Sequence, residues 1–311
     1  MKKIGIGDLH CDTLCTLRDK KLSLDNNISM VNLNTLEDGY VKLQDFACFA
    51  IYTNEPYKRV CDLIETYNQM HLDNKSLTKV LSKEDLSKDG ILTLLSIEEG
   101  GALEGKMERL YEFYKAGVRL ITLTWNFPNE IGYPNDVKAN IANTRDGLTD
   151  FGKALVKEMN KLGVVVDISH LGDKGALEVL DISTKPVVAS HSGARSIAGH
   201  VRNLTDEMIL KLIKNRGFIG INFCHDFLTD EERDATINDV VKHINHIKAL
   251  GGILNVGFGS DFDGISNQNI EMKNPSFFPC IMEELRKNGY SEEELELIGY
   301  KNIFRVLNEN L

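Results

Sequence analysis

Residues 150–170 read DFGKALVKEMNKLGVVVDISH, and this stretch contains the unit from which the fold is predicted. Its first part, Asp150–Leu162, places apolar side chains at helical spacing, and Gly163 is typical of the position just after a helix. Its second part, Val164–His170, is a short β-branched run that ends in polar residues, as in a strand buried on both faces. The stretch therefore predicts a helix that leads directly into a buried strand.

The same alternation continues along most of the chain. Further amphipathic stretches at Met107–Ala116, Thr205–Lys214 and Ile237–Leu250 predict helices, and Ser291–Glu294 is typical of a capping box that opens a terminal helix. Eight apolar runs predict strands: Ile4–His10, Phe46–Tyr52, Ile91–Glu98, Val118–Trp125, Val164–His170, Pro186–His191, Phe218–Phe223 and Leu254–Asp261. Eight strands that alternate with helices indicate an α/β protein with a parallel sheet, and their number fits a closed (β/α)8 TIM barrel. We expect residues 1–311 to form this single barrel domain.

A doubly wound open sheet is the alternative fold. Such a sheet usually carries a glycine-rich phosphate loop after its first strand. In this chain His10-Cys11-Asp12 stands in that place. The sequence therefore favours the barrel.

The composition of the chain argues against two classes of partner, nucleic acids and membranes. The chain has 311 residues, with 36 Lys+Arg against 46 Asp+Glu, so its formal net charge of −10 argues against a nucleic-acid partner, which needs a basic face. No apolar run reaches the roughly 18 residues of a membrane span, and the apolar stretch after the two N-terminal lysines is too short for a secretion signal. The six cysteines are scattered, which favours reduced thiols. We predict a cytoplasmic protein with no membrane partner.

Polar side chains follow the predicted strands at the points where the strands end. In a (β/α)8 barrel these ends meet at one rim, where the reacting groups lie. Three of the eight histidines stand there, each with another polar residue within two positions. In chain order the strands end in His10 and Asp12, Glu98-Glu99, Trp125-Asn126, Asp167-Ile168-Ser169-His170, Ser190-His191-Ser192, and Asp261 and Asp263.

Imidazole and carboxylate groups without thiolate suit a divalent cation such as Zn²⁺, with Mn²⁺ or Co²⁺ as alternatives. Five ligands can serve two ions about 3.5–4 Å apart, because one carboxylate can bridge them. Each residue alone also has a structural interpretation, such as a hydrogen-bonded histidine or a capping carboxylate. Their convergence on one rim favours the metal site. The remaining histidines are predicted to be surface or core residues: His71, His200, His225, His243 and His246.

Longer pieces of the sequence resemble the membrane (renal) dipeptidase family, which are binuclear zinc peptidases within the amidohydrolase-like barrels. The resemblance covers nearly the whole chain, from Gly7–Asp12 to Asn302–Val306, and rests on the order and spacing of its pieces. The best-matching pieces are Ser96–Gly101, Gly117–Thr124, Gly163–His170, Ser190–Ala194, Arg202-Asn203 and Gly257–Gly264.

The resemblance implies a set of metal ligands. It implies that His10 and Asp12 bind one zinc ion and that His170 and His191 bind the other. A glutamate in a Glu-Gly-Gly-like turn bridges the two ions in the family, and this chain offers both Glu98 and Glu99 there. An ungapped alignment back from the Thr-Leu-Thr run favours Glu98.

The resemblance also implies residues that handle the substrate. Arg202 matches an arginine that pairs with the terminal carboxylate of the substrate, a role that suits the two-pronged guanidinium group. Asp261 matches the carboxylate that takes a proton from the attacking water and passes it to the leaving amine. Asp263 is then a structural group. One departure is Trp125-Asn126, where many members carry His, so the contact with the oxyanion is lost, moved to Asn126 or left to the metals.

The function that the resemblance implies is a metal-dependent dipeptidase. It implies that a hydroxide bridging two zinc ions attacks the amide bond of a dipeptide, with tolerance of a D-residue at the C-terminal position. One alternative on the same rim is hydrolysis of N-acyl amino acids or cyclic amides. Another is a barrel that binds a small molecule or a metal without turnover. Family members often pair, and a homodimer is left open.

Overall fold

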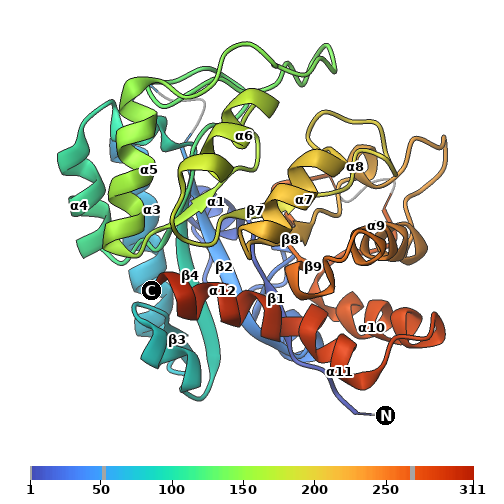
Figure 1. Ribbon diagram of the computed structural model, residues 1–311. Coiled ribbons are helices and arrows are strands. Elements are labelled where there is room, and N and C mark those ends of the chain that lie inside the picture. The colour runs from blue at the N-terminus through green and yellow to red at the C-terminus, as the bar shows by residue number, and fades with distance from the viewer. Residues whose placement is uncertain (1, 51–53, 267–269) are drawn as a thin grey trace.

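The computed structural model of the chain describes residues 2–50, 54–266 and 270–311 and shows a ring of parallel strands enclosed by helices (Figure 1). The strands are β1 (Ile6–Asp8), β2 (Val41–Phe49), β3 (Leu77–Lys79), β4 (Ile91–Glu98), β5 (Leu120–Thr122), β6 (Val165–Asp167), β7 (Val188–Ser192), β8 (Phe218–Ile221) and β9 (Val256–Phe258). Neighbours pair in the order β2-β1-β9-β8-β7-β6-β5-β4, and β2 also pairs with β4, which closes the ring. The predicted (β/α)8 barrel is confirmed.

Helices cover the outside of the ring (Figure 1). They are α1 (Thr13–Lys20), α2 (Leu33–Asp38), α3 (Pro56–Asp73), α4 (Met107–Lys115), α5 (Asp150–Leu162), α6 (Asp173–Ile182), α7 (Asp206–Lys214), α8 (His225–Leu228), α9 (Ile237–Ala249), α10 (Phe278–Lys287), α11 (Glu292–Glu296) and α12 (Asn302–Asn310). The predicted end signals are confirmed: Gly163 follows α5 with a φ of 78°, and both hydrogen bonds of the Ser291 capping box are present. Within the described ranges, no helix has both the length and the apolar character required to cross a bilayer.

Two strands differ from the predicted pattern. β2 begins at Val41, whereas the predicted run is Phe46–Tyr52, whose residues 51 and 52 lie outside the described residues. Gln44 and Asp45 are fully buried in this strand, and buried polar residues hide a strand from a search for apolar runs. The additional strand β3 pairs with the first half of one edge of β4, while β5 pairs with the second half of that edge. Three residues are too few to give a recognisable alternation.

The foot of the barrel is filled with apolar side chains. Leu43, Leu120, Val165 and Val188 from the strands, and Leu9 directly after β1, form one buried cluster with side chains of α12. α12 lies across the lower end of the ring in Figure 1. The opposite end is where the strands terminate, and it carries the loops. Among the described residues, this apolar cluster does not fill that end, which is open to polar groups.

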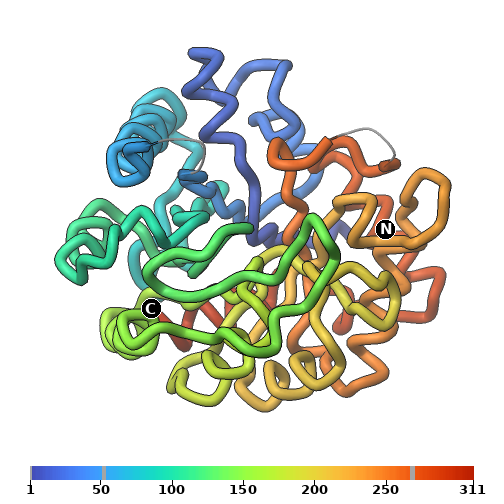
Figure 2. The backbone as a smooth tube through the Cα atoms, turned by 90° about the horizontal axis from the view of Figure 1, so that it is seen from above, coloured from blue at the N-terminus to red at the C-terminus, as the bar shows by residue number. Residues whose placement is uncertain are grey.

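A long connection between β5 and α5 crosses the mouth of the barrel. Residues 123–149 sweep over the centre of the ring when it is seen from above (Figure 2). Asn135 fastens this segment, because its amide group donates to Asp173 Oδ1 at 2.9 Å and to the Val201 carbonyl at 2.8 Å. The segment therefore forms an ordered wall over the strand ends.

Candidate metal centre

Six of the predicted residues gather at the carboxyl ends of the strands. We call them the rim cluster: His10, Asp12, Glu98, His170, His191 and Asp261. His10 and Asp12 follow β1, Glu98 ends β4 and His191 lies within β7. All six are buried except Asp261, which is half-buried. Parallel strands bring together residues that are far apart in the sequence, because their carboxyl ends share one rim.

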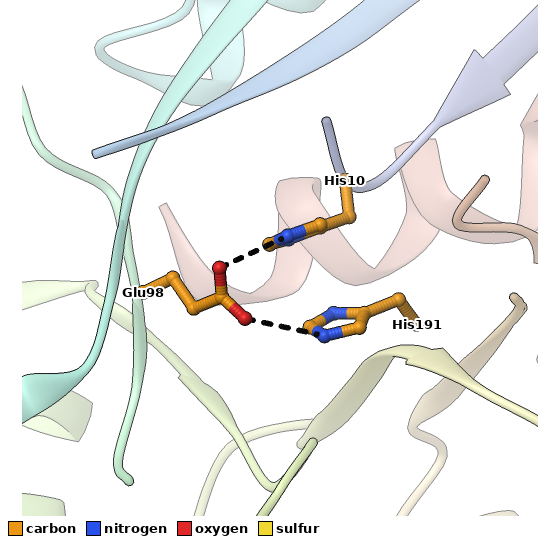
Figure 3. A group of neighbouring side chains, drawn as sticks. All are labelled: His10, Glu98 and His191. Carbon is orange, nitrogen blue, oxygen red and sulfur yellow. Dashed lines mark ion pairs between the residues drawn. The ribbon is translucent and has the colours of Figure 1, made fainter. Parts of the chain in front are cut away.

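The two carboxylate oxygens of Glu98 face different imidazoles. Oε2 lies 3.5 Å from His10 Nε2, while Oε1 lies 3.0 Å from His170 Nε2 and 3.5 Å from His191 Nε2. Figure 3 shows this carboxylate between His10 and His191, with one oxygen directed to each ring. Asp12 Oδ2 and Asp261 Oδ1 each lie 3.8 Å from His10 Nε2 on the other side. Glu98 thus connects a His/Asp group to a pair of histidines.

The histidine pair directs two lone pairs toward the same point. Ser190 donates its hydroxyl proton to Asp167 Oδ2 (2.6 Å), so it accepts the Nδ1 proton of His191 (2.7 Å). The Nδ1 proton of His170 similarly goes to Asn126 Oδ1, at 2.8 Å. Both Nε2 atoms then carry lone pairs, yet they lie only 2.9 Å apart. Two facing acceptors in a buried site are unfavourable unless a proton or a cation lies beside them, and a metal ion bound by both nitrogens would satisfy the pair.

In the other half of the rim cluster, several buried polar atoms lack a hydrogen-bond partner. Among the described residues, neither ring nitrogen of His10 has a hydrogen-bond partner, and the same holds for Asp12 Oδ1. Buried polar atoms without partners are rare in folded proteins and call for an explanation such as a bound ion. A Cβ at Gly264 would come within 2.1 Å of Asp12 Oδ2 and 2.4 Å of Asp261 Oδ1, so a larger residue there would fill the space beside both carboxylates. These residues therefore fit a divalent cation held by nitrogen and oxygen ligands.

Charge within the cluster perturbs its titration. Burial raises the pKa of Glu98 to about 8, helped by the nearby Asp12 carboxylate, and burial raises the pKa of Asp261 to about 6. Burial also lowers the pKa of His170 and His191 well below the usual value, which keeps both imidazoles neutral, the form that binds metals. For His10 the effect of burial is outweighed by the facing Glu98 and Asp12 carboxylates, which raise its pKa.

The neighbouring Glu99 lies outside the cluster. Its carboxylate accepts three hydrogen bonds, from the N–H groups of Gly101 (2.7 Å) and Trp125 (2.6 Å) and from the Asn129 amide (2.6 Å). Its φ of 84° turns the side chain away from the face that Glu98 uses. Of the two candidates, the structure therefore brings Glu98 to the histidines and uses Glu99 to fasten the loop.

The predicted substrate-binding residues line one cavity with four members of the rim cluster, Asp12, Glu98, His170 and Asp261. This cavity has a volume of about 460 Å³, and Arg202, Trp125 and Asn126 contribute to its wall. Arg202 is 4% exposed, and among the described residues its Nε has no hydrogen-bond partner, although its Nη2 donates to the His191 carbonyl at 3.2 Å. A buried guanidinium with an unused donor is suited to an anionic ligand.

Asp263 takes a structural position at the edge of the cavity. It accepts hydrogen bonds from Thr13 Oγ1 at 2.7 Å and from the Met30 N–H at 2.9 Å.

His170, Asp261 and Asp263 have φ values of 69°, 65° and 64°, in the left-handed region that non-glycine residues rarely adopt. Such conformations cluster at functional sites, where the surrounding structure holds them in place.

Sequence reasoning missed two groups that orient the cluster. Asn222 donates to Asp261 Oδ2 at 2.9 Å, and its own oxygen accepts from the Cys224 N–H at 2.6 Å. Asn222 is the only side chain with a polar group in the predicted run Phe218–Phe223, which is the signal that could have found it. The second group is Ser190 with Asp167, which fixes the ring of His191 and was visible only as polar residues near two strand ends.

The ring of strands and the rim cluster together define a (β/α)8-barrel protein with a candidate metal centre at the carboxyl ends of its strands. The family model of the membrane dipeptidases (peptidase family M19) matches residues 1–310. The chain therefore belongs to the membrane dipeptidase family.

Individual relatives agree with this assignment. The chain is 28% identical to Dipeptidase 3 of Homo sapiens over 325 residues, which cover 99% of this chain and 66% of the relative. It is 33% identical to an uncharacterized dipeptidase of Schizosaccharomyces pombe over 225 residues, which cover 72% of this chain and 54% of that protein. The chain thus spans between about half and two thirds of the length of these relatives.

Solved structures share the fold. The crystal structure of dipeptidase AC, a metallopeptidase of family M19, has a TM-score of 0.92 and 23% identity and covers 99% of both chains. A metallopeptidase from Rhodobacter sphaeroides, liganded with a phosphinate mimic of the dipeptide L-Ala-D-Ala, has a TM-score of 0.89 and 22% identity and covers 100% of both chains. At this identity the likeness supports the barrel alone.

Proposed function

We propose that this protein is a metal-dependent dipeptidase that hydrolyses the amide bond of dipeptides with two divalent cations, most simply Zn²⁺. The observation that carries the proposal is the position of Glu98, whose two oxygens face His10 on one side and the His170–His191 pair on the other. A carboxylate placed in this way suits a bridge between two ions. Family membership supports the reaction class.

The residues divide into two ligand sets. His10 and Asp12 would hold one cation and His170 and His191 the other, with Glu98 shared. Cations bound there would polarise the substrate carbonyl and lower the pKa of a water molecule, which supplies a hydroxide near neutral pH. The low exposure of the rim cluster keeps its electrostatic interactions strong.

Two further side chains would act on the substrate itself. Arg202 would hold the C-terminal carboxylate through its unused donor, which explains a preference for dipeptides, because a longer chain has no carboxylate at that point. Asp261 Oδ1, which lies 3.8 Å from His10 Nε2, would accept a proton from the attacking water and return it to the leaving amine, while Asn222 holds Oδ2. We further propose that the protein accepts a D-residue at the second position of the dipeptide.

Loss of a ligand tests the mechanism. Zinc-loaded wild-type protein should hydrolyse a panel of dipeptides, and His170→Ala should lose this activity while it still unfolds cooperatively. Undiminished turnover by that variant would remove the proposed metal centre. Two equivalents of metal per chain in the wild type, and fewer in the variant, is the expected elemental analysis.

Loss of the guanidinium tests the substrate class. Arg202→Ala should raise KM for dipeptides about 10- to 100-fold, because a charge-assisted hydrogen bond contributes about 1.5–3 kcal/mol. Arg202→Lys is the matched control, since it keeps the charge but loses the fork. Dipeptide amides, which lack the carboxylate, should be poor substrates of the wild type and should change little in either variant. If N-acyl amino acids or cyclic amides are hydrolysed faster than every dipeptide, the alternative amidohydrolase function replaces this one.

A further inference from the structure

The cavity above the rim cluster has two chemically different ends. At one end Arg202, which follows β7, lies with its Cζ atom 5.4 Å from the ring centre of Phe227. At the other end Phe49, the last residue of β2, meets Trp125, which follows β5. Their ring centres are 5.5 Å apart, with the ring planes at 62°. All four residues line the same cavity.

The topology places Phe49 across the ring from Arg202, whereas Trp125 follows β5, which is two strands from β7. Around the closed ring the strands follow the order β1, β2, β4, β5, β6, β7, β8, β9, so β2 and β7 are four strands apart in a ring of eight. Phe49 and Arg202 therefore stand on opposite sides of the mouth. The rim cluster lies between them, with Glu98 at the end of β4 and His191 in β7.

The aromatic end extends outward from the cluster to the surface. The Trp125 ring centre lies 5.9 Å from the ring centre of His170 and 5.4 Å from that of Phe127, whose side chain is 57% exposed. We call Phe49, Trp125 and Phe127 the aromatic wall. The backbone N–H of Trp125 is fixed on Glu99 Oε2 at 2.6 Å, so the wall is anchored beside the ligand strand β4. No member of the wall carries an ionisable group.

The placement of Arg202 fixes how a dipeptide would lie in the cavity. With its carboxylate on Arg202 and its amide bond over the rim cluster, the first residue of the dipeptide points away from Arg202, toward the aromatic wall. Aromatic rings favour edge-on and offset contacts with further rings, and they bury large apolar groups well. A charged side chain at this end would lose water without gaining a charged partner from the wall.

We propose that the aromatic wall makes this protein selective for dipeptides whose N-terminal residue carries an aromatic or large aliphatic side chain. This inference rests on the proposed dipeptidase function and assigns the specificity of its first subsite to Phe49 and Trp125, which line the cavity, while Phe127 packs against Trp125 outside the cavity lining. Apolar pockets discriminate by about 10- to 200-fold between side chains of different size. We therefore expect kcat/KM for Phe-Ala and Leu-Ala to exceed that for Gly-Ala at least about tenfold.

The first test uses the wild-type protein alone. Zinc-loaded enzyme is assayed with X-Ala dipeptides, in which X is Gly, Ala, Leu, Phe, Lys or Glu, and with the mirrored Ala-X set. The expected ranking places Phe and Leu first at the N-terminal position and Lys and Glu last. A flat ranking, or one led by Lys or Glu, overturns the specificity while leaving the dipeptidase function intact. Hydrolysis of no dipeptide at all instead overturns the proposed function.

The second test assigns the preference to the wall. Phe49→Ala, Trp125→Ala and Phe127→Ala should each lower the ratio of kcat/KM for Phe-Ala to that for Gly-Ala, with the smallest change for the exposed Phe127. Because both substrates are measured on one preparation, a partly misfolded variant does not distort the ratio. Phe227→Ala, at the Arg202 end, is the matched control and should leave this ratio unchanged while it alters the Ala-X series. A ratio that moves in Phe227→Ala but not in the wall variants contradicts the proposed orientation.

Discussion

Two sets of buried acidic side chains in this barrel differ in how their oxygens are satisfied. The inner carboxylates, Asp8 and Asp167, accept hydrogen bonds from hydroxyl and N–H groups at both oxygens. Asp8 accepts from Ser260 N and Oγ at 2.8 and 2.6 Å. Asp167 accepts from the N–H groups of Ser169 and Ser190, both at 2.9 Å, and from the hydroxyls of Thr122 and Ser190, both at 2.6 Å. In the rim cluster, Glu98 and Asp12 instead face imidazoles and other carboxylates. The inner carboxylates are completed by the protein, whereas the rim carboxylates are arranged for an external cation.

The largest expected effect separates two adjacent residues of the chain. Glu98→Gln should lower the affinity for zinc by more than about 100-fold, since loss of outer-shell partners alone costs 10- to 100-fold. The metal-free variant should be at least as stable as the metal-free wild type, because the change removes a buried carboxylate that Asp12 repels. Competition with a chelating dye gives the affinity, and urea unfolding in the presence of a chelator gives the stability. Unchanged zinc affinity would place Glu98 with the inner carboxylates.

A second effect extends the comparison to histidine. His243 is fully buried, and both of its ring nitrogens are used: Nδ1 accepts from the Ala194 N–H at 2.9 Å, and Nε2–H donates to the Leu228 carbonyl at 3.2 Å. Burial lowers the pKa of His243 from 6.5 to about 4. The unfolded chain therefore binds more protons between these values, so the contribution of His243 is complete above pH 6.5 and is lost as pH falls toward 4.

The expected size of this pH effect is about 3 kcal/mol, at 1.36 kcal/mol per pKa unit. Urea unfolding at pH 7 and pH 4.5 measures it as the difference between wild type and His243→Gln, whose amide can accept and donate at similar positions but does not titrate. The variant should show the shallower dependence on pH. Equal slopes in the two proteins would show that His243 takes up its proton at the same pH in the folded and the unfolded chain.

The third expected effect concerns Glu99, the neighbour of Glu98, and is mainly a loss of stability. Glu99→Gln should destabilise the metal-free protein by about 2 kcal/mol, because it turns one of the oxygens facing the Gly101 and Trp125 N–H groups or the Asn129 amide into a donor. Zinc affinity should fall much less than in Glu98→Gln. The two variants, measured side by side by urea unfolding and metal titration, should therefore show opposite profiles. A Glu99 variant with normal stability and poor zinc binding would reverse the assignment of the two residues.

The smallest expected effect is that of Ser190, which lies between the inner carboxylates and the rim cluster. Ser190 connects His191 Nδ1 to the inner carboxylate Asp167, so Ser190→Ala should weaken zinc binding about tenfold without removing a ligand. Ser190→Thr keeps the hydroxyl and serves as the control. Zinc titration by calorimetry distinguishes the two variants. Equal affinity in both would show that the hydroxyl does not orient His191.

The elements that the sequence predicts correctly are those marked by the spacing of apolar residues close together in the chain. β4 is predicted with both ends correct, because Ile91–Glu98 is a mostly apolar run, with only Thr93 and Ser96 inside it, that ends in a carboxylate. α5 is predicted equally well from its periodicity and Gly163. The start of β2 is missed because Gln44 and Asp45 are buried through contacts with other strands, such as the bond from Ser96 to Asp45.

The same limit applies to the candidate site. The sequence predicts which side chains reach the rim, since each stands at or near the end of a strand, but it cannot choose between Glu98 and Glu99 by pattern alone. Neighbouring residues on a strand point to opposite faces, and that choice depends on where the strand ends and on the left-handed turn at Glu99. Asn222 is missed for a related reason: its role comes from a contact with Asp261, 39 residues away.

The positive φ angles of His170, Asp261 and Asp263 bear on attempts to make this protein more heat-resistant. A non-glycine residue held in such a conformation costs on the order of 1–3 kcal/mol, and glycine relieves that cost. A mutant library selected only for thermal stability should thus accumulate glycine at these positions. The selected variants would gain stability and lose the proposed activity. Selection for heat resistance would have to be coupled to selection for turnover at every round.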